Sequence, residues 1–241
     1  MKHSIRSRIP GLRGFTLTEL LVVIAIIIVL AALLFPVFSR VQSALQATDA
    51  VNRIRQCGIV VMQKATENNN LLLIHVSGTS SNMHDLRLYG MVREALDAGD
   101  PDKLVYTPAY EKQASGTWPV WGVNLDDNKD LGVDWERVWL IRGGEERYVE
   151  GLRLGRGSAA GQYPLLADSS NSEGVPRARF ANDNTHKFAM RYRRKGPIFF
   201  LDGSARLVGQ QDMGNYGITK AYLFTSDPVE APTLVTAKSK F

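Results

Sequence analysis

The chain has 241 residues, of which 44% are hydrophobic and 22% are charged. The length is enough for one domain of ordinary size, and the composition argues against wholesale disorder. The formal net charge of +5 is concentrated in the first fourteen residues, which carry four basic and no acidic residues. The rest is close to neutral, so the charge balance does not indicate a nucleic-acid partner. The single cysteine, Cys57, excludes an intramolecular disulfide. We expect a small buried hydrophobe there, with an intermolecular disulfide as the alternative.

An uncharged apolar segment follows the basic N-terminus. Residues 20–39 read LLVVIAIIIVLAALLFPVFS, between Glu19 and Arg40. As a helix this segment spans roughly 30 Å, the thickness of a bilayer core. The basic residues before it favour an N-terminus in the cytoplasm and the rest of the chain outside.

Other N-terminal signals fit this segment less well. It is longer than the apolar region of a cleaved secretory signal, and no convincing cleavage site follows it. Cys57 lies too far downstream for a lipoprotein signal. A plain signal anchor fits, but it leaves Glu19 unexplained. A carboxylate near hydrocarbon costs about 2–3 kcal/mol or more without a partner, so Glu19 is a candidate functional residue.

The residues around Glu19 form a recognisable string, Arg13 followed by GFTLTELL. It resembles the prepilin processing motif of type IV pilin-like proteins and type II secretion pseudopilins. In that motif a glycine precedes a phenylalanine, and a glutamate is the fifth residue of the mature chain. The basic leader, residues 1–14, and the hydrophobic helix directly after it also match this family.

The resemblance implies a maturation chemistry. A membrane aspartyl prepilin peptidase would cut between Gly14 and Phe15 and methylate the new amine of Phe15. Gly14 lacks a side chain, which lets the peptidase approach the scissile bond closely. Glu19 would pair with the N-terminal amine of a neighbouring subunit, which neutralises two buried charges and sets the register between subunits. Pro36 falls where many type IV pilins have a helix-bending proline, so we expect a kink or local melting near residues 32–36.

The helical pattern continues beyond residue 40 but becomes amphipathic. Apolar residues recur at helical spacing among polar ones, including Val41, Leu45 and Ile54. We predict one helix over residues 16–66, with an assembly segment at 15–39 and an amphipathic segment at 40–67 that packs on a sheet. The asparagines at 68–70 are a natural stop.

Residues 68–226 are predicted to form an α+β head with a mainly antiparallel sheet. A further helix is expected at 84–98, and Asp202 and Gly203 are a two-residue hairpin signal between strands at 197–201 and 204–208. Residues 227–241 are predicted to be an irregular tail. The other candidate strands are 71–76, 104–107, 117–123, 138–142, 148–154 and 163–167.

The head resembles one bacterial subfamily of pilin-like proteins with a C-terminal His…Asp-Gly signature. The similar residues are Trp121 to Asn124, Leu165 to Ser169, His186, and Phe199 to Gly203, in that order. The histidine departs from the family spacing, because fifteen residues lie between His186 and Asp202. The family usually has a second histidine just after the turn, where this chain has Ser204.

Two groups of acidic residues are candidate metal sites. Asp168, Asp183, His186 and Asp202 are ligand types for zinc or iron, although their spacing selects no geometry. We favour structural roles for them, with Asp202 in a turn. The second group, Asp126, Asn128 and Asp130, resembles a calcium loop. It fails the EF-hand template, which places a glycine at Leu131 and a glutamate at Arg137. A solvated acidic loop is the interpretation we favour.

A compact basic segment contains Arg191, Tyr192, Arg193, Arg194 and Lys195. It is a candidate nucleic-acid contact, since arginines bind phosphates and a tyrosine stacks on a base. The alternative, which we favour, is a charged edge that blocks association of strands. The sequence contains no convincing catalytic triad, phosphate loop or paired-cysteine site, so we expect neither an enzyme nor a cofactor.

These observations indicate a structural subunit, major or minor, of a type IV pilus or a type II secretion pseudopilus. Its expected partners are the prepilin peptidase and other pilin or pseudopilin subunits. Its expected location is the cytoplasmic membrane, crossed once, and then a periplasmic or cell-surface filament. The alternative is a membrane-anchored surface module whose head binds DNA, a glycan or a secreted substrate.

Overall fold

The computed structural model describes residues 15–76, 104, 121–124, 131, 133–142, 145–154, 160–176, 179–181, 186–224 and 233–237. Contacts divide the chain into two compact units, Met1–Gln42 and Ser43–Phe241. The leader with Gly14, the expected helix at 84–98 and the candidate calcium loop lie outside the described residues, as does Asp183.

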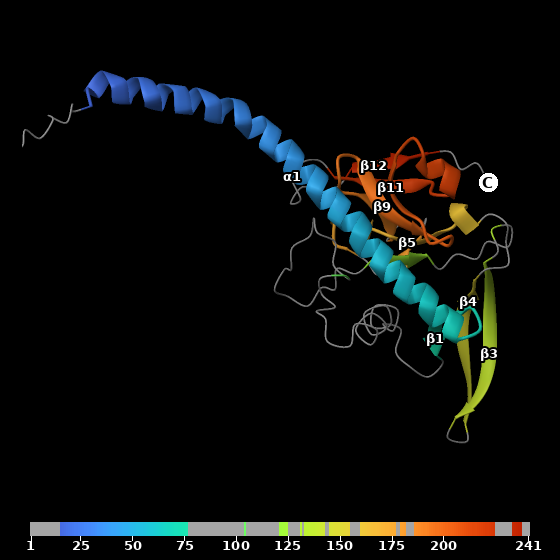
Figure 1. Cartoon of the computed structure of the whole chain (residues 1–241). Coiled ribbons are helices and arrows are strands. Elements are labelled where there is room, and N and C mark those ends of the chain that lie inside the picture. Colours follow the sequence, from blue (N-terminus) through green and yellow to red (C-terminus); the bar gives the residue numbers. More distant parts are fainter. Residues whose placement is uncertain are drawn as a thin grey trace, which may run out of the picture. The chain divides into compact units, whose positions relative to one another are not determined.

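A single long helix, α1, runs from Leu17 to Glu67 (Figure 1). This confirms the helix predicted over residues 16–66. It is helical without interruption through residues 32–36, so the local melting expected at Pro36 is not observed. By length and composition, α1 is long and apolar enough to cross a membrane.

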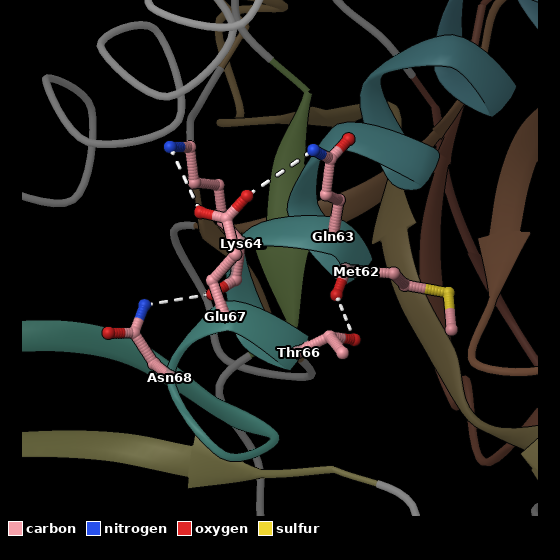
Figure 2. Close-up of polar contacts among 6 residues, drawn as sticks. All are labelled: Met62, Gln63, Lys64, Thr66, Glu67 and Asn68. Atoms are coloured by element: carbon pink, nitrogen blue, oxygen red, sulfur yellow. Dashed lines mark hydrogen bonds and ion pairs between the residues drawn. The ribbon is translucent and has the colours of Figure 1, made fainter.

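Side chains near the C-terminal end of α1 satisfy carbonyls of its last turns (Figure 2). The amide of Asn68 donates a hydrogen bond of 2.8 Å to the carbonyl of Lys64, and the hydroxyl of Thr66 donates one of 2.9 Å to the carbonyl of Met62. Residues 69 and 70 then adopt positive φ angles of 56° and 61°. Asparagine tolerates this conformation better than most residues, which explains why the asparagine run ends the helix.

Three sheets and two short 3₁₀ helices make up the rest of the described second unit (Figure 1). The first sheet has the order β1 (Leu71–Val76), β4 (Glu145–Arg153), β3 (Asp134–Arg142). The second has the order β10 (Ala205–Gly209), β9 (Lys195–Phe200), β5 (Pro164–Ala167), β2 (Gly122–Asn124), β7 (Arg179–Phe180). The third has the order β12 (Thr233–Thr236), β11 (Lys220–Leu223), β8 (Lys187–Met190), β6 (Ser169–Ser170). The 3₁₀ helices are η2 (Ala160–Gln162) and η3 (Met213–Tyr216).

The described pairings are antiparallel except for β2 with β7 and β8 with β11. An α+β layout with mainly antiparallel sheets, as predicted, is therefore observed. The β1 strand coincides with its predicted range, and β3, β4, β5, β9 and β10 each overlap a predicted strand.

The central strand β9 is buried on both faces, which explains its nearly continuous apolar sequence. Phe199 belongs to a core cluster that also contains residues of α1. Ile198 and Phe200 belong to a second cluster that contains Phe188 and Met190 of the third sheet. The second sheet is therefore buried between α1 and the third sheet.

Close packing of α1 on β9 depends on a glycine. A Cβ atom built on Gly58 would lie 2.3 Å from the ring of Phe199, which is far below van der Waals contact. Only a residue without a side chain allows the helix backbone to approach the aromatic ring this closely. The sequence analysis predicted the sheet contact of this half of the helix, and the structure identifies the residue pair that sets its distance.

Four details of the sequence prediction are wrong. Leu104 is helical rather than extended. The β9–β10 connection is longer than two residues, since the amide of Phe200 bonds the carbonyl of Ser204 and Gly203 takes a positive φ of 83°. Residues 233–236 form strand β12 instead of an irregular tail, because their run of β-branched and apolar residues pairs with β11. The short strands β6, β7, β8 and β11 were not predicted.

Candidate processing and assembly site

The N-terminal end of α1 is closed by a reciprocal cap between Thr16 and Glu19. The Glu19 carboxylate accepts hydrogen bonds of 2.8 Å from both the amide and the hydroxyl of Thr16. In return, the Glu19 amide donates a hydrogen bond of 3.3 Å to the Thr16 hydroxyl. This is the capping-box arrangement, in which two backbone donors at a helix start are satisfied by each other's side chains.

Sequence reasoning assigned Glu19 to assembly but missed its capping role. The signal was present, because Thr16 and Glu19 have the Thr-x-x-Glu spacing of a capping box. A carboxylate in the first turn of a helix is also favoured by the helix dipole. Phe15 and Glu19 are both exposed. Both hydrogen bonds from Thr16 end on Oε2 of Glu19, and the exposed carboxylate is accessible to a further donor.

The segment after the cap presents apolar side chains all round the helix. Every described side chain from residue 20 to residue 35 is exposed. An apolar helix without a buried face is typical of a membrane span or of a helix buried in an assembly. The exposed large hydrophobic side chains of this segment are Leu20, Leu21, Val22, Val23, Ile24, Ile26, Ile27, Ile28, Val29, Leu30, Leu33, Leu34 and Phe35.

The later part of α1 has one buried stripe. Its members recur three or four residues apart, which places them on one face of the helix. They are Ala47, Ala50, Ile54, Cys57, Val61 and Ala65. Most are small, which allows the helix axis to lie close to the sheet. The amphipathic pattern predicted for this segment is therefore observed.

Cys57 is part of this stripe and is fully buried. Its thiol donates a hydrogen bond of 3.1 Å to the carbonyl of Leu104, which also accepts one of 2.8 Å from the indole of Trp121. Burial raises the pKa of the Cys57 thiol to about 12, against weaker opposing effects of Trp121 and Arg53. The buried position disfavours an intermolecular disulfide and agrees with the structural role expected from the sequence.

The basic segment at residues 191–195 is divided by the fold. Arg191 is buried, forms an ion pair of 3.2 Å with buried Asp168, and donates a hydrogen bond of 3.0 Å to the carbonyl of Gly174. Tyr192 is buried as well. Arg193, Arg194 and Lys195 are exposed, the first two with positive φ angles of 49° and 64° in the turn before β9. The candidate nucleic-acid contact at residues 191–195 is therefore reduced to the three exposed basic residues of this turn.

The acidic residues proposed as metal ligands have separate roles. Asp168 pairs with Arg191, and Asp202 accepts a hydrogen bond of 2.9 Å from the amide of Ser204 in the β9–β10 connection. Burial acts to raise the pKa of Asp202, but hydrogen bonds from Ser204 and the charge of Arg206 outweigh it and lower the pKa. Within the described part of the chain, no three histidine, cysteine or acidic residues form a group suited to a metal ion. Asp126, Asn128 and Asp130 lie outside that part.

No known protein family, curated protein or solved structure matches this chain. The function must therefore be argued from the N-terminal segment, α1 and the chemistry of the head. Of these, the N-terminal end of α1 has an acidic residue, Glu19, directly before an apolar segment, and the side chains of Phe15, Thr16 and Glu19 are exposed.

Proposed function

We propose that this protein is a type IV pilin-like subunit, major or minor, that is matured by a prepilin peptidase and assembled into a pilus or a secretion pseudopilus. The observation that carries the proposal is the Gly14-Phe15…Glu19 string directly before a helix that is apolar all round and then amphipathic. The long helix and the α+β head support this proposal, because such a subunit needs both an assembly segment and a folded domain.

Maturation would release the leader, residues 1–14, on the cytoplasmic side of the membrane. The four basic residues of the leader favour that orientation, with the head on the other side. The new N-terminal amine of Phe15 would then lie next to the helix cap. A positive amine at the positive end of a helix dipole is unfavourable, so it requires a nearby anion. Glu19 is the acidic residue of the first turn.

Glu19 would have two successive partners in this scheme. Before assembly, its carboxylate is held by Thr16 in the capping box. In the filament, the same group would pair with the N-terminal amine of a neighbouring subunit. An ion pair in an apolar environment is favourable only when both charges are matched, so mispaired registers would be rejected.

We also place the head in the subfamily with the His…Asp-Gly signature. Asp202 and Gly203 lie within the β9–β10 connection, and Trp121 of the aromatic-glycine step is buried beside Cys57. The His186 side chain is partly buried, and its carbonyl accepts a hydrogen bond from the amide of Ala181. These positions are consistent with structural roles for the shared residues.

Mass spectrometry of membrane-fraction protein tests the maturation step. The chain is produced with its prepilin peptidase, beside a Gly14→Val variant whose branched side chain blocks close approach to the scissile bond. We expect the loss of residues 1–14 and one methyl group on Phe15, both absent from the variant. A full-length chain in the presence of active peptidase would refute the proposal and leave a signal-anchored protein.

A second experiment separates the two roles of Glu19. Glutamine also functions at the third helical position of a capping box, so Glu19→Gln keeps the cap and removes the charge. Thr16→Ala removes the cap and keeps the charge. We expect both variants to be processed, but only Glu19→Gln to be lost from sheared filaments or crosslinked oligomers. If Glu19→Gln assembles like the wild type, the carboxylate does not set the register.

A further inference from the structure

A row of three side chains on β3 has no role in the proposed function. Trp135, Arg137 and Trp139 are all exposed, whereas Asp134 and Glu136, the residues on either side of Trp135, are less exposed. Alternate residues of a strand point to the same face, so the three side chains share one face of β3. We call Trp135, Arg137 and Trp139 the tryptophan row.

At one end, the row continues a face of the sheet that is buried in the core. Leu152 pairs with Trp135 in the register of the sheet, so its side chain lies on the same face as the row, and it is fully buried. On the opposite face of the strands, Glu136 forms an ion pair with Arg153 of β4. β1 pairs with residues 149–153 of β4, and beyond it β3 and β4 continue as a two-stranded ribbon that runs away from β5 and β9 (Figure 1). One end of the row therefore lies at the core, and the other lies on the ribbon.

Exposure of both indoles is unusual for this residue type. Trp135 is 41% exposed and Trp139 is 62% exposed, whereas Trp121 is 1% exposed. Tryptophan is highly buried on average, and exposed aromatic groups that lie together mark binding surfaces. The two indoles are four positions apart on the strand, which corresponds to about 13 Å between their Cα atoms. This spacing suits a ligand that is extended along the strand.

The charge of the ribbon selects the chemistry of that ligand. Strands β3 and β4 together carry five acidic and four basic residues. A nearly neutral ribbon does not complement a polyanion such as a nucleic acid, whose binding requires a basic surface. Indole faces complement flat apolar surfaces, and the guanidinium of Arg137 supplies hydrogen-bond donors between them. Sugar rings, with an apolar C–H face and hydroxyls at their edges, match this combination.

We propose that the tryptophan row binds an uncharged polysaccharide chain laid along β3. The two indoles stack on sugar rings, and Arg137 donates hydrogen bonds to hydroxyl groups between them. The inference concerns the head alone. It does not depend on cleavage at Gly14, so a failure of the maturation experiment leaves it standing, and its own failure leaves maturation untouched.

Retention on insoluble polysaccharides tests the proposal. Full-length protein in detergent micelles is mixed with cellulose, chitin, mannan and starch granules, beside Trp139→Ala and the double variant Trp135→Ala/Trp139→Ala. We expect retention on at least one of these polymers, reduced about tenfold or more by the double variant. The matched control is Leu234→Ala, which removes an exposed hydrophobic side chain from β12 and is expected to bind like the wild type.

Two measurements complete the test. Thermal unfolding should be nearly unchanged in Trp139→Ala, because that side chain is mostly exposed, so lost binding would not reflect lost folding. Intrinsic fluorescence should shift when soluble oligosaccharide of the retained polymer is added to the wild type but not to the double variant. Absence of retention on all four polymers overturns the proposal. A double variant that is retained on the polysaccharide like the wild type also overturns it. If that variant in addition no longer associates with other subunits, the row binds a protein partner instead.

Discussion

The two halves of α1 have similar helical geometry and opposite surroundings. Residues 20–35 expose every described side chain, although almost all are large and apolar. From Ala47 to Ala65, by contrast, one stripe is buried and the rest of the surface is polar or partly exposed. The difference shows that the partner of the second half is the head of the same chain. Within the described residues, the first half has no buried face, which is typical of a helix that spans a bilayer or is buried in an assembly.

The stripe in the second half explains why the helix and the sheet approach closely. Ala47, Ala50, Cys57 and Ala65 are small, and Gly58 admits the ring of Phe199. In the first half, large branched residues occupy every side, which favours contact with fluid or repeating apolar surroundings over contact with one fixed sheet. Substitutions in the two halves should therefore affect different measurements.

The largest expected effect on folding comes from Ile54→Ala, in the buried stripe. Ile54 is fully buried, so the truncation should lower the free energy of unfolding by about 2–5 kcal/mol. The matched control is Ile59→Ala on the same helix, where the side chain is 54% exposed and the change should stay within about 0.5 kcal/mol. Chemical denaturation of the detergent-solubilised chain measures both. Equal effects of the two variants would show that the stripe is wrongly placed.

In the first half, Ile27→Asp should act on membrane insertion instead of folding. An aspartate near the centre of a span costs about 2.5–3.5 kcal/mol for insertion. We expect less protein in the membrane fraction, with denaturation of the head unchanged. Ile27→Leu is the control and should fractionate like the wild type. Normal insertion of the aspartate variant would argue against residues 20–39 as the span.

Gly58→Ala tests the close contact between the second half of α1 and strand β9. The added methyl would overlap the Phe199 ring, and relief of such overpacking typically costs about 1–3 kcal/mol. Gly209→Ala is the control, since a Cβ there has its nearest neighbour at 3.6 Å. A shift in the denaturation midpoint for Gly58→Ala alone is the expected result. If both variants unfold alike, the close approach of α1 and β9 is wrong.

The smallest effect concerns Cys57 and pH. The thiol has its ordinary pKa of 9.0 in the unfolded chain, whereas burial raises its pKa to about 12 in the folded chain. The folded state is therefore favoured at pH below 9, and this contribution is lost as pH rises from 9 to 12. Cys57→Ala should lack that part of the pH dependence. At pH 8, iodoacetamide should modify Cys57 only after denaturant is added, and rapid modification of the native chain would contradict its burial.

Local patterns in the sequence were sufficient to predict the long helix and several strands. The helix at residues 16–66 follows from continuous helical spacing and the asparagine stop, and β1 follows from a short apolar run. The capping box of Thr16 and Glu19 was equally local and was overlooked, because Glu19 was interpreted only through its assembly role.

Contacts between residues far apart in the chain could not be predicted from local patterns. The buried pair of Asp168 and Arg191 joins residues 23 positions apart, and it removes Arg191 from the candidate basic surface at residues 191–195. Strand β12 is short and lies in a polar C-terminal segment, so only its pairing with β11 identifies it. The exposure of Trp139 was also not predicted, since the sequence does not show how far along β3 the core extends.

The sequence by itself determined the residues around Glu19 on which the proposed processing depends, the apolar segment and the amphipathic continuation of the helix, because each depends on neighbouring residues and on helical periodicity. The tertiary structure alone decided which charges are buried, how closely α1 approaches β9, and which tryptophans reach the surface. The physical reason is that burial and pairing are set by segments far apart in the chain. The free energy of a side chain in the head therefore depends on neighbours that its local sequence does not specify.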